Sequence, residues 1–140
     1  MRTDSVEPIP LPLDGERFIL GEMYGNIELE LRHRYLFASQ FVSGKAVLEI
    51  ACGEGYGSAL LAKSARRVTG VDIAEVAVEH ARQRCQAENL EFVTGSCAAI
   101  PLGDGAVDVV VSFETIEHHA EQETMMREIN RVLRFPGGCL

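Results

Sequence analysis

The sequence has no tryptophan, few other aromatic residues and no excess of basic side chains. Its 21 acidic and 13 basic residues give a formal net charge of −8 at pH 7. A partner held through its phosphate backbone needs a basic face, so the charge argues against nucleic acid. No apolar run approaches the roughly 18 to 20 residues of a membrane span, and the first residues lack a signal-peptide core. We therefore expect a cytoplasmic protein without a membrane span.

Cysteine spacings typical of metal or redox sites are also missing. The four cysteines are Cys52, Cys85, Cys97 and Cys139, and no two of them form a CxxC pair. Cys52 and Cys97 lie in or beside apolar segments, which favours free, buried thiols. Free thiols are typical of a reducing compartment.

The chain is long enough for one domain with a single hydrophobic core. Three of its five prolines fall within residues 1–15, which predicts an extended or disordered leader. Residues 16–44 are expected to form an N-terminal helical cover, because apolar residues recur at helical spacing between residues 27 and 41, and Gly44 is a plausible helix stop. Residues 45–140 then form the core of the domain.

Within that core, short β-branched runs alternate with helical segments. Predicted strands span residues 46–51, 67–72, 91–95 and 106–113, and predicted helices span residues 58–65, 74–86 and 121–133. This alternation indicates right-handed βαβ units and a parallel sheet. We expect an α/β fold with a doubly wound, mostly parallel, Rossmann-like sheet, in which ligands bind beyond the carboxyl ends of the strands.

The stretch AVLEIACGEGYGSALLA, residues 46–62, places a carboxylate and three glycines where the first strand becomes a helix. Glycine lets the backbone approach a ligand, and a helix N-terminus offers free N–H groups to an anion. The dinucleotide fingerprint fits badly, because Ser58 occupies its third glycine position and Glu49 would repel a pyrophosphate. A ligand carrying the ammonium and carboxylate of an amino acid fits both features.

Asp72 ends the second strand, where a carboxylate can accept hydrogen bonds from two ribose hydroxyls. Its alternative role is to cap the helix that starts near Ala74. We favour the ribose role, because the glycine turn independently predicts a ligand.

Glu49, the glycines and Asp72 together resemble the class I S-adenosylmethionine-dependent methyltransferases, of the methyltransferase type 11 kind. The likeness covers about residues 45–140 and includes the closing sequence RVLRFPGG. It implies S-adenosylmethionine as the cofactor and methyl transfer to a small-molecule or sugar acceptor, with oxygen as the expected acceptor atom. It also implies seven strands in the order 3-2-1-4-5-7-6, of which this chain supplies four and the first residues of a fifth.

The resemblance also assigns cofactor contacts. Gly53 and Gly55 would approach the methionine portion, Glu49 would lie near its amino end, and Asp72 would hold the ribose with Ile73 against the adenine. The full set of implied cofactor contacts is Glu49, Ala51, Gly53, Gly55, Asp72, Ile73, Ser96, Cys97, Phe113 and Arg34. Two departures from the family pattern occur: Ser96 and Cys97 stand where related sequences carry Asp-Ala, and Phe135 precedes the Pro-Gly-Gly turn.

A narrower resemblance rests on GERF, GEMYGNIELELRHRYLFA, ACGEGYGSALLA and VVVSFETIEH. These segments are similar to methyltransferases associated with bacterial glycosyltransferases in surface-polysaccharide pathways. In that light His33, Arg34 and Tyr35 would lie over the cofactor, with Arg34 facing its carboxylate. The alternative is a helix face with a solvated arginine.

The segment ETIEHH follows the fourth strand and leaves three alternatives open. His118 could be a general base for an acceptor hydroxyl, with Glu117 beside it. Glu114, Glu117 and His118 could instead share a helical face and bind a divalent ion, although our main prediction includes no metal. In the third alternative the cluster orders the loop without chemistry. His119 adds a positional ambiguity to any assignment of His118.

The fourth strand would be a long apolar edge if the chain ended within its fifth strand, as we expect for a truncated chain. A homodimer sealed through that strand is the expected consequence, and the activity of such a chain is in doubt. The alternative function is a non-catalytic cofactor-binding or interaction module of a larger glycosyltransferase system. A nicotinamide-dependent oxidoreductase is a more distant alternative.

Overall fold

The computed structural model describes residues 25–140. The predicted leader, residues 1–15, and the first part of the predicted helical cover lie outside the described residues. The elements in chain order are α1 (Gly25–Ala38), η1 (Ser39–Phe41), β1 (Ala46–Ile50), α2 (Tyr56–Leu61), β2 (Arg67–Asp72), α3 (Glu75–Arg84), β3 (Leu90–Thr94), β4 (Val109–Ser112), η2 (Ile116–His118) and α4 (Gln122–Val132). No helix in this described part of the chain is long and apolar enough to cross a membrane.

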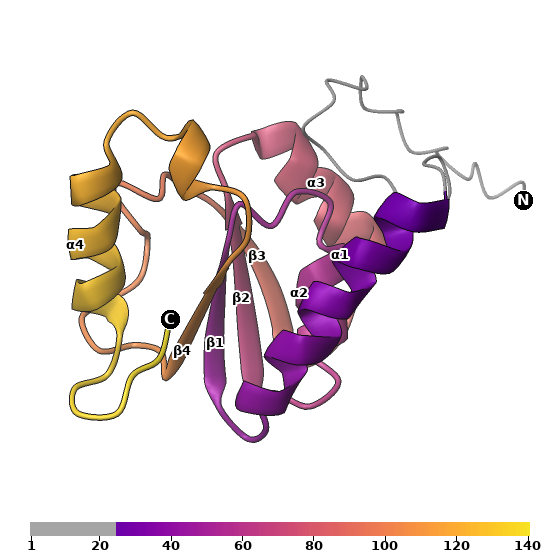
Figure 1. Ribbon diagram of the computed structural model, residues 1–140, viewed down its shortest axis with the longest axis horizontal. Helices are drawn as coiled ribbons and strands as arrows, with labels where there is room; N and C mark the ends of the chain where they lie inside the picture. The colour runs from indigo at the N-terminus through magenta and orange to yellow at the C-terminus, as the bar shows by residue number, and fades with distance from the viewer. Residues whose placement is uncertain (1–24) are drawn as a thin grey trace, which may run out of the picture.

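Four parallel strands form one sheet in the order β3-β2-β1-β4 (Figure 1). The first strand, β1, lies inside the sheet. β2 and then β3 follow on one side of it, and β4 pairs on its other side. The strand order therefore reverses beside β1, and ligands of open α/β sheets bind at such a reversal. This arrangement confirms the predicted α/β class and parallel sheet.

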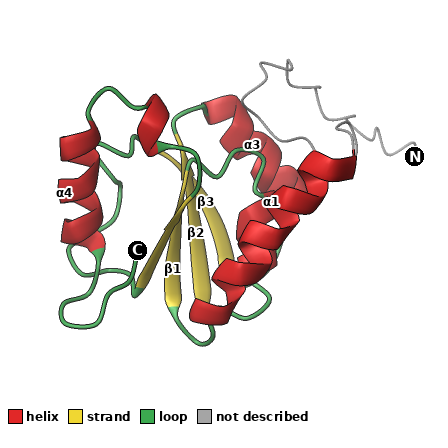
Figure 2. Ribbon diagram, in the orientation of Figure 1, coloured by secondary structure: helices red, strands yellow, loops and turns green. Residues whose placement is uncertain are grey.

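Helices cover both faces of the sheet, as Figure 2 shows. All five residues of β1 are buried, because each of its faces meets a layer of helices. Val47 packs in the cluster that includes Ala38 and Leu61 on the side of α1 and α2. Its neighbour Leu48 points the other way, into the cluster that contains Met125 of α4. Successive side chains of one strand thus hold the two layers together.

The predicted helix over residues 58–65 differs most from its structure. α2 begins two residues earlier, at Tyr56, and ends at Leu61. Its early start follows from Gly55, whose φ of 82° lies in the left-handed region and turns the chain directly into the helix. The fourth strand is also shorter than predicted, because only Val109–Ser112 pairs with β1.

The C-terminal residues approach the free side of β4. The Cys139 N–H donates to the Asp108 carbonyl at 3.0 Å, and the Val110 N–H donates to the Cys139 carbonyl at 2.9 Å. These bonds form a parallel bridge between Val109 and Cys139. The residues expected to begin a fifth strand therefore lie where such a strand would pair.

Candidate functional site

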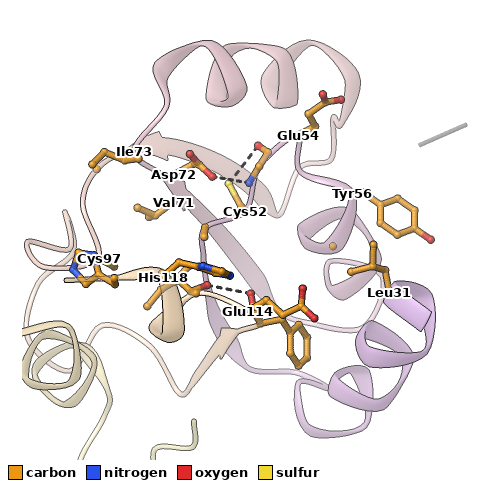
Figure 3. Close-up of a pocket in the computed structure, with 18 of the residues that line it drawn as sticks. Leu31, Cys52, Glu54, Tyr56, Val71, Asp72, Ile73, Cys97, Glu114 and His118 are labelled. Carbon is orange, nitrogen blue, oxygen red and sulfur yellow. Dashed lines mark hydrogen bonds between the residues drawn. The ribbon is translucent and has the colours of Figure 1, made fainter. Parts of the chain in front are cut away.

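A cavity of about 580 Å³ opens at the carboxyl ends of the strands, and Figure 3 shows its wall. Its volume falls within the roughly 300–1,000 Å³ typical of small-molecule and cofactor sites. Eight of the ten predicted cofactor contacts line it: Arg34, Ala51, Gly53, Asp72, Ile73, Ser96, Cys97 and Phe113. Glu49 and Gly55 are not among its lining residues.

The three glycines of the turn after β1 have different surroundings. Gly53 lines the cavity with a φ of 52°, and a Cβ built on it would meet no atom within 4 Å. A Cβ on Gly55 would lie 2.5 Å from the Phe92 ring, and one on Gly57 would lie 2.0 Å from the Tyr35 ring. Of the three, Gly53 alone has open space where a side chain would lie, whereas Gly55 and Gly57 make room for packing; Gly57 also lines the cavity.

Asp72 joins the glycine turn to the start of α3. Its Oδ2 accepts a hydrogen bond from the Gly53 N–H at 2.8 Å, and its Oδ1 accepts one from the Ala74 N–H at 2.9 Å. Each carboxylate oxygen can accept further bonds, so both oxygens can still receive ligand hydroxyls. Asp72 therefore lines the cavity, but the alternative role as a helix cap is not realised: its bond reaches Ala74, the residue before the helix, and α3 has no side-chain cap.

Glu49 lies behind the cavity wall and is only 2% exposed. Its carboxylate accepts hydrogen bonds from the hydroxyl of Tyr35 on α1 and from the hydroxyl of Ser58 on α2. Burial raises the pKa of Glu49 to about 7, and the two hydroxyl donors oppose that rise. The structure thus gives Glu49 contacts with two helices, where the resemblance implied a direct contact with the cofactor.

The predicted adenine-binding side contains Ile73 and the turn after β3. Ile73 is 76% exposed although its side chain is apolar, and it lines the cavity. The Ser96 hydroxyl accepts a hydrogen bond from the Ala98 N–H at 3.1 Å, which closes the turn locally. Cys97 lines the cavity and is half-buried, whereas we expected it to be fully buried; all four cysteines are free.

Arg34 lies on α1 and also lines the cavity. Its guanidinium lies 2.5 Å from the Glu114 carboxylate, so the two form an ion pair. Glu114 has a φ of 52°, in the left-handed region that non-glycine residues seldom adopt. Next to Arg34, the Tyr35 ring packs edge-on against Phe113 with ring centroids 5.3 Å apart. α1 and the loop after β4 thus meet over the cavity.

The helical face predicted for Glu114, Glu117 and His118 does not form. Only Ile116–His118 are helical, as a short 3-10 turn, and Glu114 lies before that turn with its left-handed φ. His118 lines the cavity, as Figure 3 shows, but Glu117 does not. Across residues 25–140 no three His, Cys, Asp or Glu side chains gather as a metal site would require.

Among the lining residues, Tyr56 and Thr115 were absent from the prediction, and His119 was named there only as an alternative to His118. Tyr56 is the first residue of α2, and Thr115 belongs to the loop after β4. His119 is half-buried, and its Nε2 is buried without a hydrogen-bond partner. Their only sequence signal was position next to a predicted contact, because side-chain direction in a loop depends on backbone angles that residue type does not specify.

A family model described as "Methyltransferase domain" matches residues 48–140 of the chain. The chain is 43% identical over 137 residues to a probable S-adenosylmethionine-dependent methyltransferase of Mycolicibacterium smegmatis, covering 96% of this chain and 52% of that protein. It is 36% identical over 99 residues to a fatty-acid O-methyltransferase of the same species, covering 69% of this chain and 36% of that protein.

Among solved structures, a protein from Pyrococcus horikoshii matches with a TM-score of 0.72 and 28% identity, covering 82% of this chain and 56% of that one. The parallel sheet and the cavity beyond Gly53 and Asp72 define an α/β domain with a cavity at the carboxyl ends of its strands. The chain belongs to the S-adenosylmethionine-dependent methyltransferases of this methyltransferase-domain family. It spans about half the length of the relatives it matches.

Proposed function

We propose that this chain binds S-adenosylmethionine and contributes to methyl transfer onto an oxygen atom. The observation that carries the proposal is the bond between Asp72 and the Gly53 N–H, which brings two predicted cofactor contacts together at the cavity wall. Gly53 leaves space where a side chain would intrude, and the exposed apolar Ile73 suits a flat, apolar ring. These features fit a ligand with a ribose between an amino-acid end and a base.

In this proposal the residues of the chain bind and align the reactants. S-adenosylmethionine, when bound, supplies an electron-poor methyl carbon on a sulfonium. Asp72 accepts bonds from the ribose hydroxyls, and the backbone at Gly53 approaches the methionine portion. Alignment of the acceptor oxygen with the methyl at roughly 3 to 3.5 Å supplies most of the acceleration.

His118 is our proposed general base for a hydroxyl acceptor. It lines the same cavity as Asp72, and an imidazole nitrogen can accept the proton of an acceptor hydroxyl. Glu117 does not line the cavity, so the proposal gives it no contact with the acceptor. A divalent ion has no part in this proposal.

The proposed acceptor is a small molecule or a sugar, as in pathways that include glycosyltransferases. The likeness to a fatty-acid O-methyltransferase supports oxygen as the acceptor atom. We further propose a cytoplasmic location and a homodimer formed along the outer backbone edge of β4 beside its bridge to Cys139, because the side chains of Val109, Val110 and Val111 are already buried. Size-exclusion chromatography with light scattering would test the dimer directly.

Turnover tests the proposed chemistry. S-adenosylhomocysteine formation would be measured with S-adenosylmethionine and a panel of hydroxylated and carboxylated acceptors. With the best acceptor, His118→Ala should lower turnover by about 100-fold or more, while affinity for S-adenosylhomocysteine stays within about threefold. Glu123→Gln, on an exposed position of α4, is the control and should leave both unchanged. An unchanged rate in His118→Ala would remove the proposed base.

A further inference from the structure

A buried carboxyl group with two hydroxyl donors lies behind the cavity, although nothing in the proposed reaction touches it. Glu49 is fully enclosed between three elements: its own strand β1, α1 through Tyr35 and α2 through Ser58. An ionised carboxylate in such a place is costly unless donors compensate for the lost water. Both hydroxyls donate to it, so their arrangement favours the charged form.

We infer that Tyr35 is a positioning residue that keeps Glu49 ionised, and that the charge of Glu49 makes the cavity prefer a cationic ligand over its neutral analogue. The inference rests on the proposed function, because S-adenosylmethionine carries a sulfonium cation whereas its product S-adenosylhomocysteine carries a neutral thioether. The charge of Glu49 would therefore favour binding of S-adenosylmethionine over retention of S-adenosylhomocysteine.

The position of Tyr35 supports this role independently of any titration. Its ring fills the space that a Gly57 side chain would occupy, and it packs edge-on against Phe113 and Tyr56, both in the cavity wall. Tyr35 itself lines the cavity. One side chain therefore faces the ligand with its ring and the buried carboxylate with its hydroxyl.

The electrostatic influence of Glu49 extends to the cavity wall. The Glu49 charge contributes, after burial, to the raised pKa of Cys52, which lines the cavity. Glu49 pairs with Val111 of β4, so that strand adds no titratable group opposite it. The charged or titratable groups around this region come from the other neighbouring elements. They are Tyr35 and Arg34 on α1, Cys52 after β1, Tyr56 on α2, Asp72 on β2, Cys85 after α3, and Glu54, Glu114, His118 and His119 around the cavity.

Other ionisable groups line the same cavity, so a pH profile of the wild-type protein alone does not isolate Glu49. Tyr35→Phe does isolate it, because this variant keeps the ring and removes only the hydroxyl donor. Loss of one donor to the charged form raises the pKa of Glu49 further. The effect should therefore appear above about pH 7, the pKa of Glu49 in the wild type.

The experiment is calorimetric titration of the chain with S-adenosylmethionine and with S-adenosylhomocysteine at pH values from about 6.5 to 9. We expect the ratio of the two affinities to favour the sulfonium on the order of fivefold at pH 8 in the wild type. Tyr35→Phe should lose that preference at pH 7.5 and regain it at pH 9. Ser58→Ala should behave in the same way, since its hydroxyl donates to the same carboxylate.

Ser39→Ala is the matched control. The Ser39 hydroxyl donates to the Tyr35 carbonyl at 2.7 Å. The variant therefore removes a hydrogen bond at the same end of α1 but leaves both donors to Glu49 in place. It should leave the pH at which the preference develops unchanged. The inference is overturned if Tyr35→Phe and Ser58→Ala keep the wild-type ratio at every pH, or weaken both ligands equally at every pH. A wild-type protein that binds neither ligand would instead overturn the proposed function itself.

Discussion

Gly57→Ala should destabilise this protein, against the ordinary expectation for a helix. Gly57 lies within α2, where alanine is favoured over glycine by up to about 1 kcal/mol. In this structure, however, a Cβ at that position would lie 2.0 Å from Tyr35 Cζ and 2.4 Å from its hydroxyl oxygen. The Tyr35 ring must therefore move away from Phe113 and Glu49.

Two costs set the size of the destabilisation by Gly57→Ala. Overpacking of a filled site costs about 1–3 kcal/mol, and loss of a hydrogen bond to a charged group costs about 1.5–3 kcal/mol. The two costs sum to about 2.5–6 kcal/mol, so after the helix gain is subtracted the free energy of unfolding should fall by about 1.5–5 kcal/mol. Urea denaturation at pH 7.5 measures it, and Gly103→Ala, where a Cβ meets nothing within 4 Å, is the control.

A double-mutant cycle identifies the cause. In a Tyr35→Ala background the ring is absent, so Gly57→Ala should cost nothing and can recover part of the helix gain. The reasoning is refuted if Gly57→Ala stabilises the wild type, or if its cost persists unchanged when Tyr35 is alanine.

Two further predictions concern the buried carboxyl group of Glu49 and the hydrogen bonds that Arg131 donates from α4. Because the pKa of Glu49 is raised to about 7 in the folded protein, the unfolded chain ionises first as pH rises from about 4.5. The free energy of unfolding of the wild type, relative to Glu49→Gln, should fall by about 3 kcal/mol between pH 4.5 and 7.5; a flat difference would refute this. Arg131 donates to the carbonyls of Ile100 and Leu102 and pairs with Glu128, so Arg131→Ala should cost about 1–2 kcal/mol in urea denaturation. Arg127→Ala, an exposed pair on the same helix, should cost at most about 0.5 kcal/mol.

The sheet and most of the cavity wall could be predicted because their sequence signals are local. β1 is followed within three residues by Gly53, β2 ends at Asp72, and parallel strands bring such ends to one edge of the sheet. The predicted contacts Ile73, Ser96 and Phe113 follow strand ends in the same way, and all line the cavity.

The contacts of Glu49 could not be predicted, because they depend on where α1 packs. Spacing along the chain indicates a helix but not which residue of the sheet it meets. Tyr35 is fourteen residues before Glu49, yet its hydroxyl donates to that carboxylate. For the same reason the prediction took Gly55 as a cofactor contact and did not foresee that Phe92 and Tyr35 require the second and third glycines.

The central claim is that the cavity beside Gly53 and Asp72 holds S-adenosylmethionine, and calorimetric titration with S-adenosylhomocysteine tests it most directly. We predict micromolar binding to the wild-type chain, at least about 100-fold weaker binding to a folded Asp72→Ala variant, and no binding of NAD. Circular dichroism would establish that the variant is folded. Failure of the folded wild type to bind S-adenosylhomocysteine, or undiminished binding by Asp72→Ala, would contradict the claim.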